Sequence, residues 1–203
     1  MRTNAESFLS QYPEIDTIEV LITDCNGISR GKWLSADKLS SILTDGIRLP
    51  KSALAQDIWG RDVPRIALDN GDIDGICKSI PESLTPVLGA TGVNQAQVLV
   101  TMFRDDGKPL LSDPRQVLAK IISDFHHRGL VPRIAIELEF NLFDNPKEGQ
   151  SIKESLPDLM ETGGNLYGLS DLDSHTKFLE DLQEAFRIQS LPYEGILKES
   201  APN

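Results

Sequence analysis

The chain has 203 residues, of which 39% are hydrophobic and 25% are charged, and its formal net charge is -11. This composition is that of a globular protein with enough apolar residues for one large domain or two smaller ones. The negative charge argues against nucleic acid as a partner, because a binder needs a basic surface to neutralise phosphates. The start of the chain lacks the apolar segment of an export signal, and no apolar run approaches the roughly 20 residues that span a bilayer.

The two cysteines, Cys25 and Cys77, lie far apart and fit no metal-binding or redox spacing. We therefore expect reduced thiols in a cytoplasmic protein that binds neither membrane nor nucleic acid.

The first part of the chain predicts a hairpin followed by a helix. The expected elements are a helix over 4–11, strands over 17–23 and 28–34, and a helix over 35–43. Asn26-Gly27 supplies the turn between the two strands, because these residues tolerate positive φ. Ser35 is a good helix N-cap, and Gly46 ends the helix. Strand, turn, strand and helix in this order are typical of the opening of a β-grasp domain, although other folds share the pattern.

Prolines and glycines interrupt the next fifty residues, where only short strands are expected, over 66–68 and 73–79. A longer strand over 97–103 ends in the turn that contains Gly107. We place the domain boundary directly after this turn. The predicted domains are a β-grasp domain over 1–108 and the start of a second domain over 109–203.

The second domain begins with an alternation of helices and strands. Asp113-Pro114 predicts a helix start, since Asp caps and Pro is tolerated in the first turn, and Gly129 predicts its end. The further expected elements are a strand over 132–143, a polar loop over 144–169, a helix over 170–189 and a strand over 193–199. This order is typical of the opening of an α/β layer, so the fold class predicted for the whole chain is α+β.

Glu137 and Glu139 lie two residues apart in the predicted strand over 132–143, so they share one face while the flanking apolar residues share the other. Their backbone positions would be roughly 6.6 Å apart. Two such carboxylates can each hold one of two neighbouring divalent ions that bridge nucleotide phosphates. The same pattern also fits a half-buried strand with an acidic, solvated outer face.

Several segments together resemble the glutamine synthetase family. They are Val20 to Trp33, which is similar to the N-terminal β-grasp hairpin of the family; Asp69 to Pro86, similar to its acidic stretch; Asp113-Pro114-Arg115, similar to the entry to its catalytic domain; Glu137-Leu138-Glu139-Phe140, similar to its first metal motif; and Glu199-Ser200-Ala201-Pro202, similar to the start of its second. Each segment is weak evidence alone, whereas their order and spacing are specific.

The resemblance implies roles for four carboxylates. Glu139 and Glu199 would be ligands of the metal that organises the glutamate site, and Glu137 would bind the metal that bridges the ATP phosphates. Glu194 falls where the family places a carboxylate near the nucleotide, although it also fits a solvated strand residue. The resemblance assigns no further catalytic residue to this stretch.

The activity implied is that of an ATP- and Mg²⁺- or Mn²⁺-dependent ligase. Such an enzyme phosphorylates the γ-carboxylate of glutamate, and an amine or ammonia then displaces the phosphate. The family implies a homo-oligomer with active sites between subunits. Because the remaining family motifs are not in these 203 residues, we expect the N-terminal portion of a ligase, inactive alone. The alternative is a non-catalytic binding or assembly module that keeps the fold.

One departure from the family concerns the amine acceptor. Ammonia-using members carry a Phe-Asp-Gly-Ser-Ser loop, whereas the equivalent stretch here is Leu49-Pro50-Lys51-Ser52-Ala53, without an acid. This difference favours the branch that joins glutamate to larger amines, such as the γ-glutamylpolyamine synthetases. Asp57 is the nearest downstream acid that could compensate.

Overall fold

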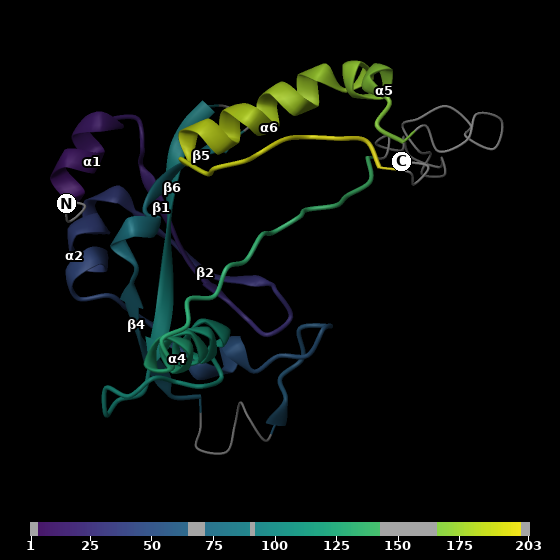
Figure 1. The fold of residues 1–203 in the computed structure, drawn as a ribbon. Coiled ribbons are helices and arrows are strands. Elements are labelled where there is room, and N and C mark those ends of the chain that lie inside the picture. The colour runs from purple at the N-terminus through teal and green to yellow at the C-terminus, as the bar shows by residue number, and fades with distance from the viewer. Residues whose placement is uncertain (1–3, 65–71, 90–91, 143–165, 200–203) are drawn as a thin grey trace. The chain divides into compact units, whose positions relative to one another are not determined.

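The computed structural model of the protein describes residues 4–64, 72–89, 92–142 and 166–199 (Figure 1). The chain forms two compact units, Met1–Pro132 and Arg133–Asn203. This division follows helix α4, whereas the sequence pattern places that helix in the second domain. In the described ranges, no helix has both the length and the apolar character needed to cross a membrane.

The first unit is built on a mixed six-stranded sheet with strand order β2-β1-β6-β4-β3, and β5 pairs with β6 beside this path. Its helices and strands are α1 (Ala5–Gln11), β1 (Thr17–Thr23), β2 (Ser29–Ser35), α2 (Leu39–Thr44), β3 (Ile47–Pro50), β4 (Asp74–Ser79), β5 (Thr85–Gly89), β6 (Gly92–Phe103) and α4 (Pro114–His127), with short 3-10 turns at Ala36–Lys38, Lys51–Leu54 and Pro81–Ser83. The β1 and β6 strands are parallel, and the other pairs are antiparallel.

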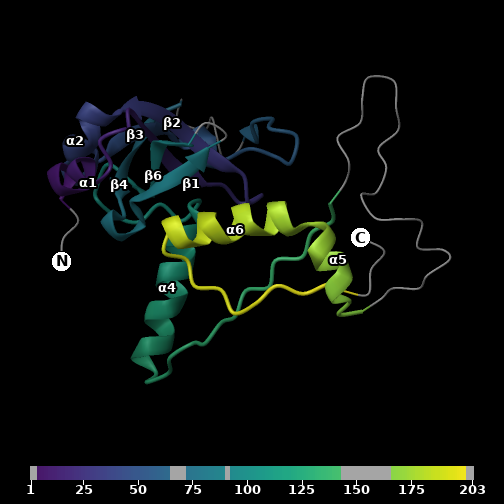
Figure 2. The same cartoon turned by 90° about the horizontal axis from the view of Figure 1, so that it is seen from above.

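The core of the first unit lies between this sheet and the helices α1 and α2 (Figure 2). Every second residue of β1 is buried, as strand geometry requires. In the parallel register, Val20 of β1 lies opposite Val98 of β6, and both are fully buried. Phe8 of α1 and Ile42 of α2 complete the same apolar cluster. Alternating strand residues and two short helices therefore supply most of this core.

Most predictions for the first unit are confirmed. The hairpin forms between β1 and β2, with Gly27 at φ 77° in its turn. The turn after β6 places Gly107 at φ 79°. The strand expected over 73–79 is β4, while the one expected over 66–68 lies outside the described residues. Helix α4 begins directly after Asp113, whose side chain accepts a hydrogen bond from the Arg115 backbone, as a capping residue does.

The second unit differs from the prediction in two ways. The single helix expected over 170–189 is two helices, α5 (Leu169–Ser174) and α6 (Thr176–Ile188), separated at His175. The expected strands over 132–143 and 193–199 are wrong for the part that the structure describes, where residues 131–142 and 191–199 join no ladder. Strands need a partner for their backbone groups, and the described residues of this unit supply none. Most of the loop expected over 144–169 lies outside the described ranges.

Candidate functional site

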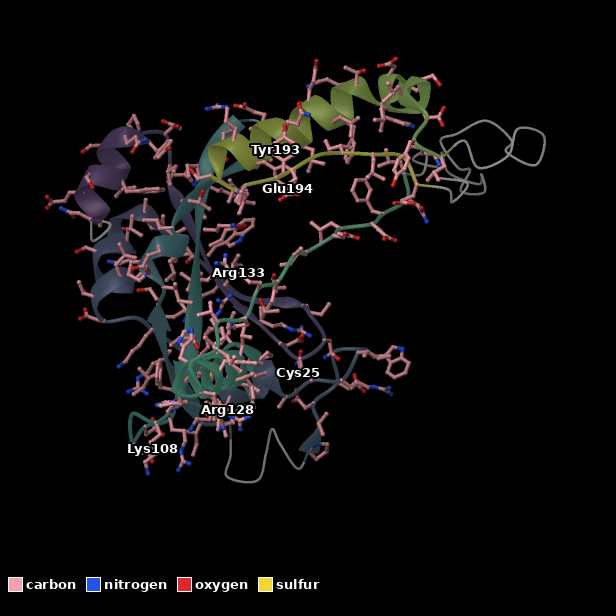
Figure 3. The ribbon with its side chains drawn as sticks, viewed as in Figure 1. Cys25, Lys108, Arg128, Arg133, Tyr193 and Glu194 are labelled. Atoms are coloured by element: carbon pink, nitrogen blue, oxygen red, sulfur yellow. The ribbon has the colours of Figure 1, made fainter. Side chains whose placement is uncertain are left out.

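Glu137 and Glu139 belong to an extended segment without helix or strand, which begins near Arg133 (Figure 3). Both carboxylates are exposed. The apolar residues that alternate with them are exposed as well: Ile136 retains 81% of its accessible surface and Leu138 retains 76%. Apolar and acidic residues of this segment are therefore exposed alike, so burial does not distinguish the two faces that the sequence pattern predicts.

One residue of this segment is anchored within the second unit. The ring of Phe140 meets that of Phe178, on α6, edge to face at 5.8 Å between centroids. This geometry is a favourable arrangement for two aromatic rings. The contact ties the segment that carries Glu137 and Glu139 to the helix that precedes Glu194.

Glu194 lies on a segment that turns back along α6 (Figure 1). The reversal passes through Ser190, which has φ 53°, and is closed by a hydrogen bond from the Leu191 backbone N–H to the Phe186 carbonyl at 2.9 Å. The ring of Tyr193 packs at 5.3 Å from that of Phe186. These contacts fix the backbone beside Glu194, whose own carboxylate is exposed (Figure 3).

Glu199 lies at the far end of the same returning segment. The backbone N–H of Tyr167, just before α5, donates to the carbonyl of Lys198 at 2.9 Å. Lys198 is buried, with 7% of its surface exposed, and its ammonium group donates to the carbonyl of Glu199. The return is therefore tied to α6 at its start and to Tyr167, two residues before α5, at its end. The motif residues that follow Glu199 lie outside the described ranges.

The predicted ligands are not gathered into one cluster. Among the residues that the structure describes, no three His, Cys, Asp or Glu side chains come close enough to hold a metal ion together. Glu137, Glu139, Glu194 and Glu199 share one compact unit and offer only carboxylate oxygens, the donor type that Mg²⁺ and Mn²⁺ prefer. The donor chemistry fits these ions, whereas a complete coordination shell needs further groups.

In the first unit, the stretch that departs from the ammonia-binding pattern runs from the end of β3 into the 3-10 turn Lys51–Leu54. Lys51 occupies its middle, and its ammonium nitrogen lies 3.4 Å from a carboxylate oxygen of Asp105. The described structure thus places a paired cation in this stretch and no acid.

Asp57 does not supply the missing acid in a free form. Its Oδ1 accepts hydrogen bonds from the backbone N–H groups of Trp59, at 2.9 Å, and Arg61, at 3.0 Å, and its Oδ2 accepts one from the Arg61 guanidinium at 3.1 Å. The bond from the Arg61 backbone, helped by Trp59 and by the Arg61 charge, lowers the pKa of this carboxyl. Both oxygens of the Asp57 carboxylate are therefore hydrogen-bonded within its own loop.

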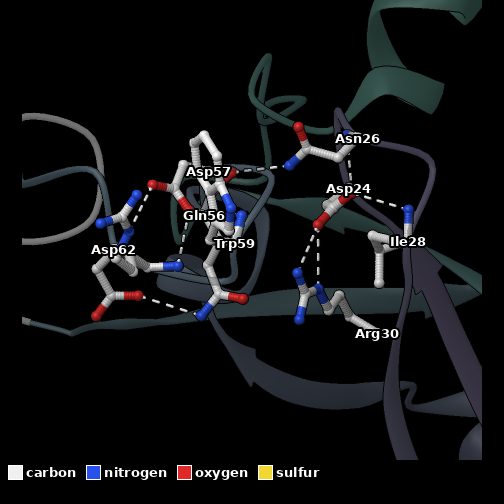
Figure 4. A network of polar contacts seen from close by, with 9 residues as sticks. Asp24, Asn26, Ile28, Arg30, Gln56, Asp57, Trp59 and Asp62 are labelled. Atoms are coloured by element: carbon white, nitrogen blue, oxygen red, sulfur yellow. Dashed lines mark hydrogen bonds and ion pairs between the residues drawn. The ribbon is translucent and has the colours of Figure 1, made fainter.

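A buried polar network lies beside this loop (Figure 4), and it joins Asp24 and Arg30, two residues of the hairpin segment that resembles the family. Asp24 is only 2% exposed, and it accepts hydrogen bonds from the backbone N–H groups of Asn26 and Ile28 and from Arg30 Nε at 2.8, 3.0 and 3.0 Å. Burial alone would raise the pKa of Asp24, but the backbone hydrogen bonds and the Arg30 charge outweigh it and lower the pKa. An Asp two residues before an Asn-Gly turn was the sequence signal available for this network.

Comparison with known proteins identifies the class. Residues 111–203 match the family model of the glutamine synthetase catalytic domain. The fold resembles a solved structure of GmaS without ligand, with a TM-score of 0.66 at 15% identity, over 96% of this chain and 42% of that one. A structure described as a novel glutamine synthase homolog gives the same TM-score at 16% identity, over 91% of this chain and 41% of that one. The mixed α/β fold is thus that of glutamine synthetase-like proteins.

Comparison of sequences shows which members of the family the chain resembles. The chain is 32% identical over 201 residues to the γ-glutamylputrescine synthetase PuuA of Escherichia coli (strain K12), covering 96% of this chain and 42% of the relative. It is 27% identical over 168 residues to a glutamine synthetase of Pyrococcus abyssi (strain GE5 / Orsay), covering 82% of this chain and 33% of the relative. The chain belongs to the glutamine synthetase family, and it spans less than half the length of these relatives.

Proposed function

We propose that this chain is part of an ATP-dependent ligase that joins the γ-carboxylate of glutamate to an amine through γ-glutamyl phosphate. The observation that carries the proposal is the match of residues 111–203 to the family's catalytic domain, since this range contains Glu137-Leu138-Glu139. The activity is proposed for a protein of the relatives' length that contains this chain, assembled as a homo-oligomer in the cytoplasm. The free thiols of Cys25 and Cys77 are consistent with that compartment.

In the proposed site, Glu139 and Glu199 hold one Mg²⁺ or Mn²⁺ ion, Glu137 holds a second, and Glu194 lies beside the nucleotide. When bound, the ions neutralise charge where phosphoryl oxygens meet the substrate carboxylate. The role of this chain is to hold those ligands in place and to help position the reactants. The contacts of the returning segment with α6 at one end and with Tyr167 at the other support a fixed placement of Glu194 and Glu199.

We further propose that the acceptor is an alkyl amine and not ammonia. A second, separate proposal is that the first unit is a β-grasp domain. The relative that is 32% identical is named for a putrescine product, while the glutamine synthetase of Pyrococcus abyssi is 27% identical. In the stretch that departs from the ammonia-binding pattern, Lys51 is paired with Asp105, and the Asp57 carboxylate is bonded to Arg61. Neither residue offers a free acid to ammonium. The hairpin next to a parallel β1–β6 pair, with helices on it, supports the β-grasp assignment.

The test compares the 203-residue chain with a longer protein that contains it. Calorimetric titration of Mg–ATP into the 203-residue chain should show weak binding, and phosphate release with glutamate and a panel of amines should be absent. A protein of the relatives' length should release phosphate with diamines more readily than with ammonium. The Glu139→Ala variant of that protein should lose the release.

Two outcomes would count against the proposal. Sub-micromolar Mg–ATP binding by the 203-residue chain, with amine-dependent release above its own Glu139→Ala control, would show that the site is complete within these residues. A longer protein that folds but releases no phosphate with any amine would favour the non-catalytic module instead.

A further inference from the structure

The loop over residues 55–63, here called the arm, is closed by its own backbone. Val63 N–H donates to the Ala55 carbonyl at 2.9 Å, and Gln56 and Asp62 form a bridge between the two sides. At the tip, the N–H of Asp57 donates to the Arg61 carbonyl at 2.8 Å, and Gly60 adopts φ 76°. The arm is thus a small hairpin with a defined turn.

The tip of the arm carries two large apolar side chains in the solvent. Ile58 is 70% exposed and Trp59 is 72% exposed. The Arg61 guanidinium stacks 4.9 Å from the centroid of the Trp59 ring, and the Asp57 carboxylate holds the same guanidinium. The Trp59 ring therefore contacts a guanidinium that Asp57 holds in place within the arm.

Internal bonds define the shape of the arm but not its direction on the first unit. A hydrogen bond from a residue outside the arm restrains this direction. The side-chain Nδ2 of Asn26 donates to the Gln56 carbonyl at 2.9 Å, across 30 residues of sequence. The backbone of Asn26 is itself fixed, because its N–H donates to the buried Asp24 carboxylate at 2.8 Å (Figure 4). One amide thus joins the turn of the β1–β2 hairpin to the base of the arm.

We propose that Asn26 is a positioning residue that orients the arm on the first unit, so that the hairpin turn and the arm behave as one rigid body. The buried Asp24 supplies the fixed point, Asn26 the link, and Asp57 the internal brace. The Ile58–Trp59 tip is then presented in a set direction before it meets any other molecule. A preoriented element loses little conformational entropy when it is contacted.

The experiment measures arm order in the 203-residue chain by chymotryptic cleavage after Trp59. Asn26→Ala removes the donor, and Asn26→Asp removes it while keeping a residue that suits the same turn. Both variants should be cleaved about fivefold faster after Trp59, the factor that one hydrogen bond of ordinary net strength contributes to local opening. Cleavage after the exposed Tyr193, in the other unit, should not change and serves as the internal reference.

A matched control removes an amide elsewhere. Gln11→Ala deletes a side-chain bond to the Tyr12 hydroxyl at the exposed C-terminal end of α1 and should leave cleavage after Trp59 at the wild-type rate. In a Trp33→Phe background, which leaves Trp59 as the single tryptophan, Asn26→Asp should lower the fluorescence anisotropy. Unchanged cleavage in both Asn26 variants would overturn the proposal, and so would acceleration in Asn26→Ala alone, since that result would assign Asn26 to the turn only.

Discussion

At the residue scale, the buried carboxylate of Asp24 is the clearest example in the first unit of a charge that the fold stabilises. Its three hydrogen bonds and its 3.0 Å ion pair with Arg30 would all be weakened in Asp24→Asn. We expect the free energy of unfolding at pH 7 to fall by about 2 kcal/mol, below the range for fully buried pairs because Arg30 is partly exposed. Urea denaturation monitored by circular dichroism measures the change.

The same variant should also change the pH dependence of stability. Because the pKa of Asp24 in the folded state lies below its ordinary value of 3.8, the carboxylate stabilises the fold above that value. This contribution is lost as the pH falls through the lowered pKa, so the gap between wild type and Asp24→Asn should narrow between pH 5 and pH 3, roughly the window of such a titration. Asp37→Asn, at an exposed site where an ion pair contributes little, should change stability at pH 7 far less. A constant gap across this range would contradict the assignment.

Two glycines of the β1–β2 hairpin offer a matched pair of substitutions. Gly31 has φ 152°, and a Cβ there would lie 1.8 Å from the Val20 carbonyl oxygen, whereas a Cβ at Gly27, with φ 77°, would meet open space. We expect Gly31→Ala to cost about 3 kcal/mol, because backbone must move in addition to the strain. Gly27→Ala should cost about 1 kcal/mol from conformation alone. Thermal denaturation of the two variants checks the order, and equal losses would refute the steric argument.

At the element scale, Asp113 fastens helix α4 to the sheet. Its Oδ1 caps the helix through the Arg115 N–H at 2.8 Å, and its Oδ2 accepts from the Thr101 hydroxyl and the Met102 N–H of β6, both at 2.7 Å. Asp113→Ala should therefore cost about 3 kcal/mol, since it removes a cap and leaves buried donors without a partner. Asn4→Ala, which removes the exposed cap of α1, should cost about 1 kcal/mol. Denaturant unfolding of both variants gives the comparison, and equal costs would show that the tie to β6 is unimportant.

Local signals explain which elements were predictable. The hairpin and the start of α4 follow from a turn pair and a capping dipeptide, so short-range chemistry decides them. The parallel pairing of β1 with β6 joins segments more than 70 residues apart, and no local pattern reports it. The pattern around Glu137 predicted which residues would share a face, but alternation says nothing about the partner strand. The ligand set came from the resemblance, and the described residues do not assemble it.

At the scale of the whole molecule, the described part of the second unit has helices but no strand ladder. Two of its described segments join no strand ladder and carry exposed apolar residues: Ile134, Ile136, Leu138 and Phe140 on one, and Leu191, Tyr193 and Leu197 on the other. Several exposed apolar side chains on one short segment often mark a contact with further protein. The chain spans 42% of the γ-glutamylputrescine synthetase to which it is similar. We therefore expect the strand pattern of these segments to be realised in a protein of the relatives' length.

Hydrogen exchange tests this expectation directly. In the 203-residue chain, amides over 134–140 belong to no helix or ladder and should exchange fast, whereas amides of β6, where Val98 and Met102 are fully buried, should exchange slowly. In a protein of the relatives' length that contains the chain, the same 134–140 amides should become protected by orders of magnitude, because strand pairing would bond them. Peptide-resolved mass spectrometry on both proteins gives the comparison, with the β6 peptide as reference. Fast exchange over 134–140 in a longer protein that shows ligase activity would mean that Glu137 and Glu139 act from an unpaired segment and that the strand-based metal site is wrong.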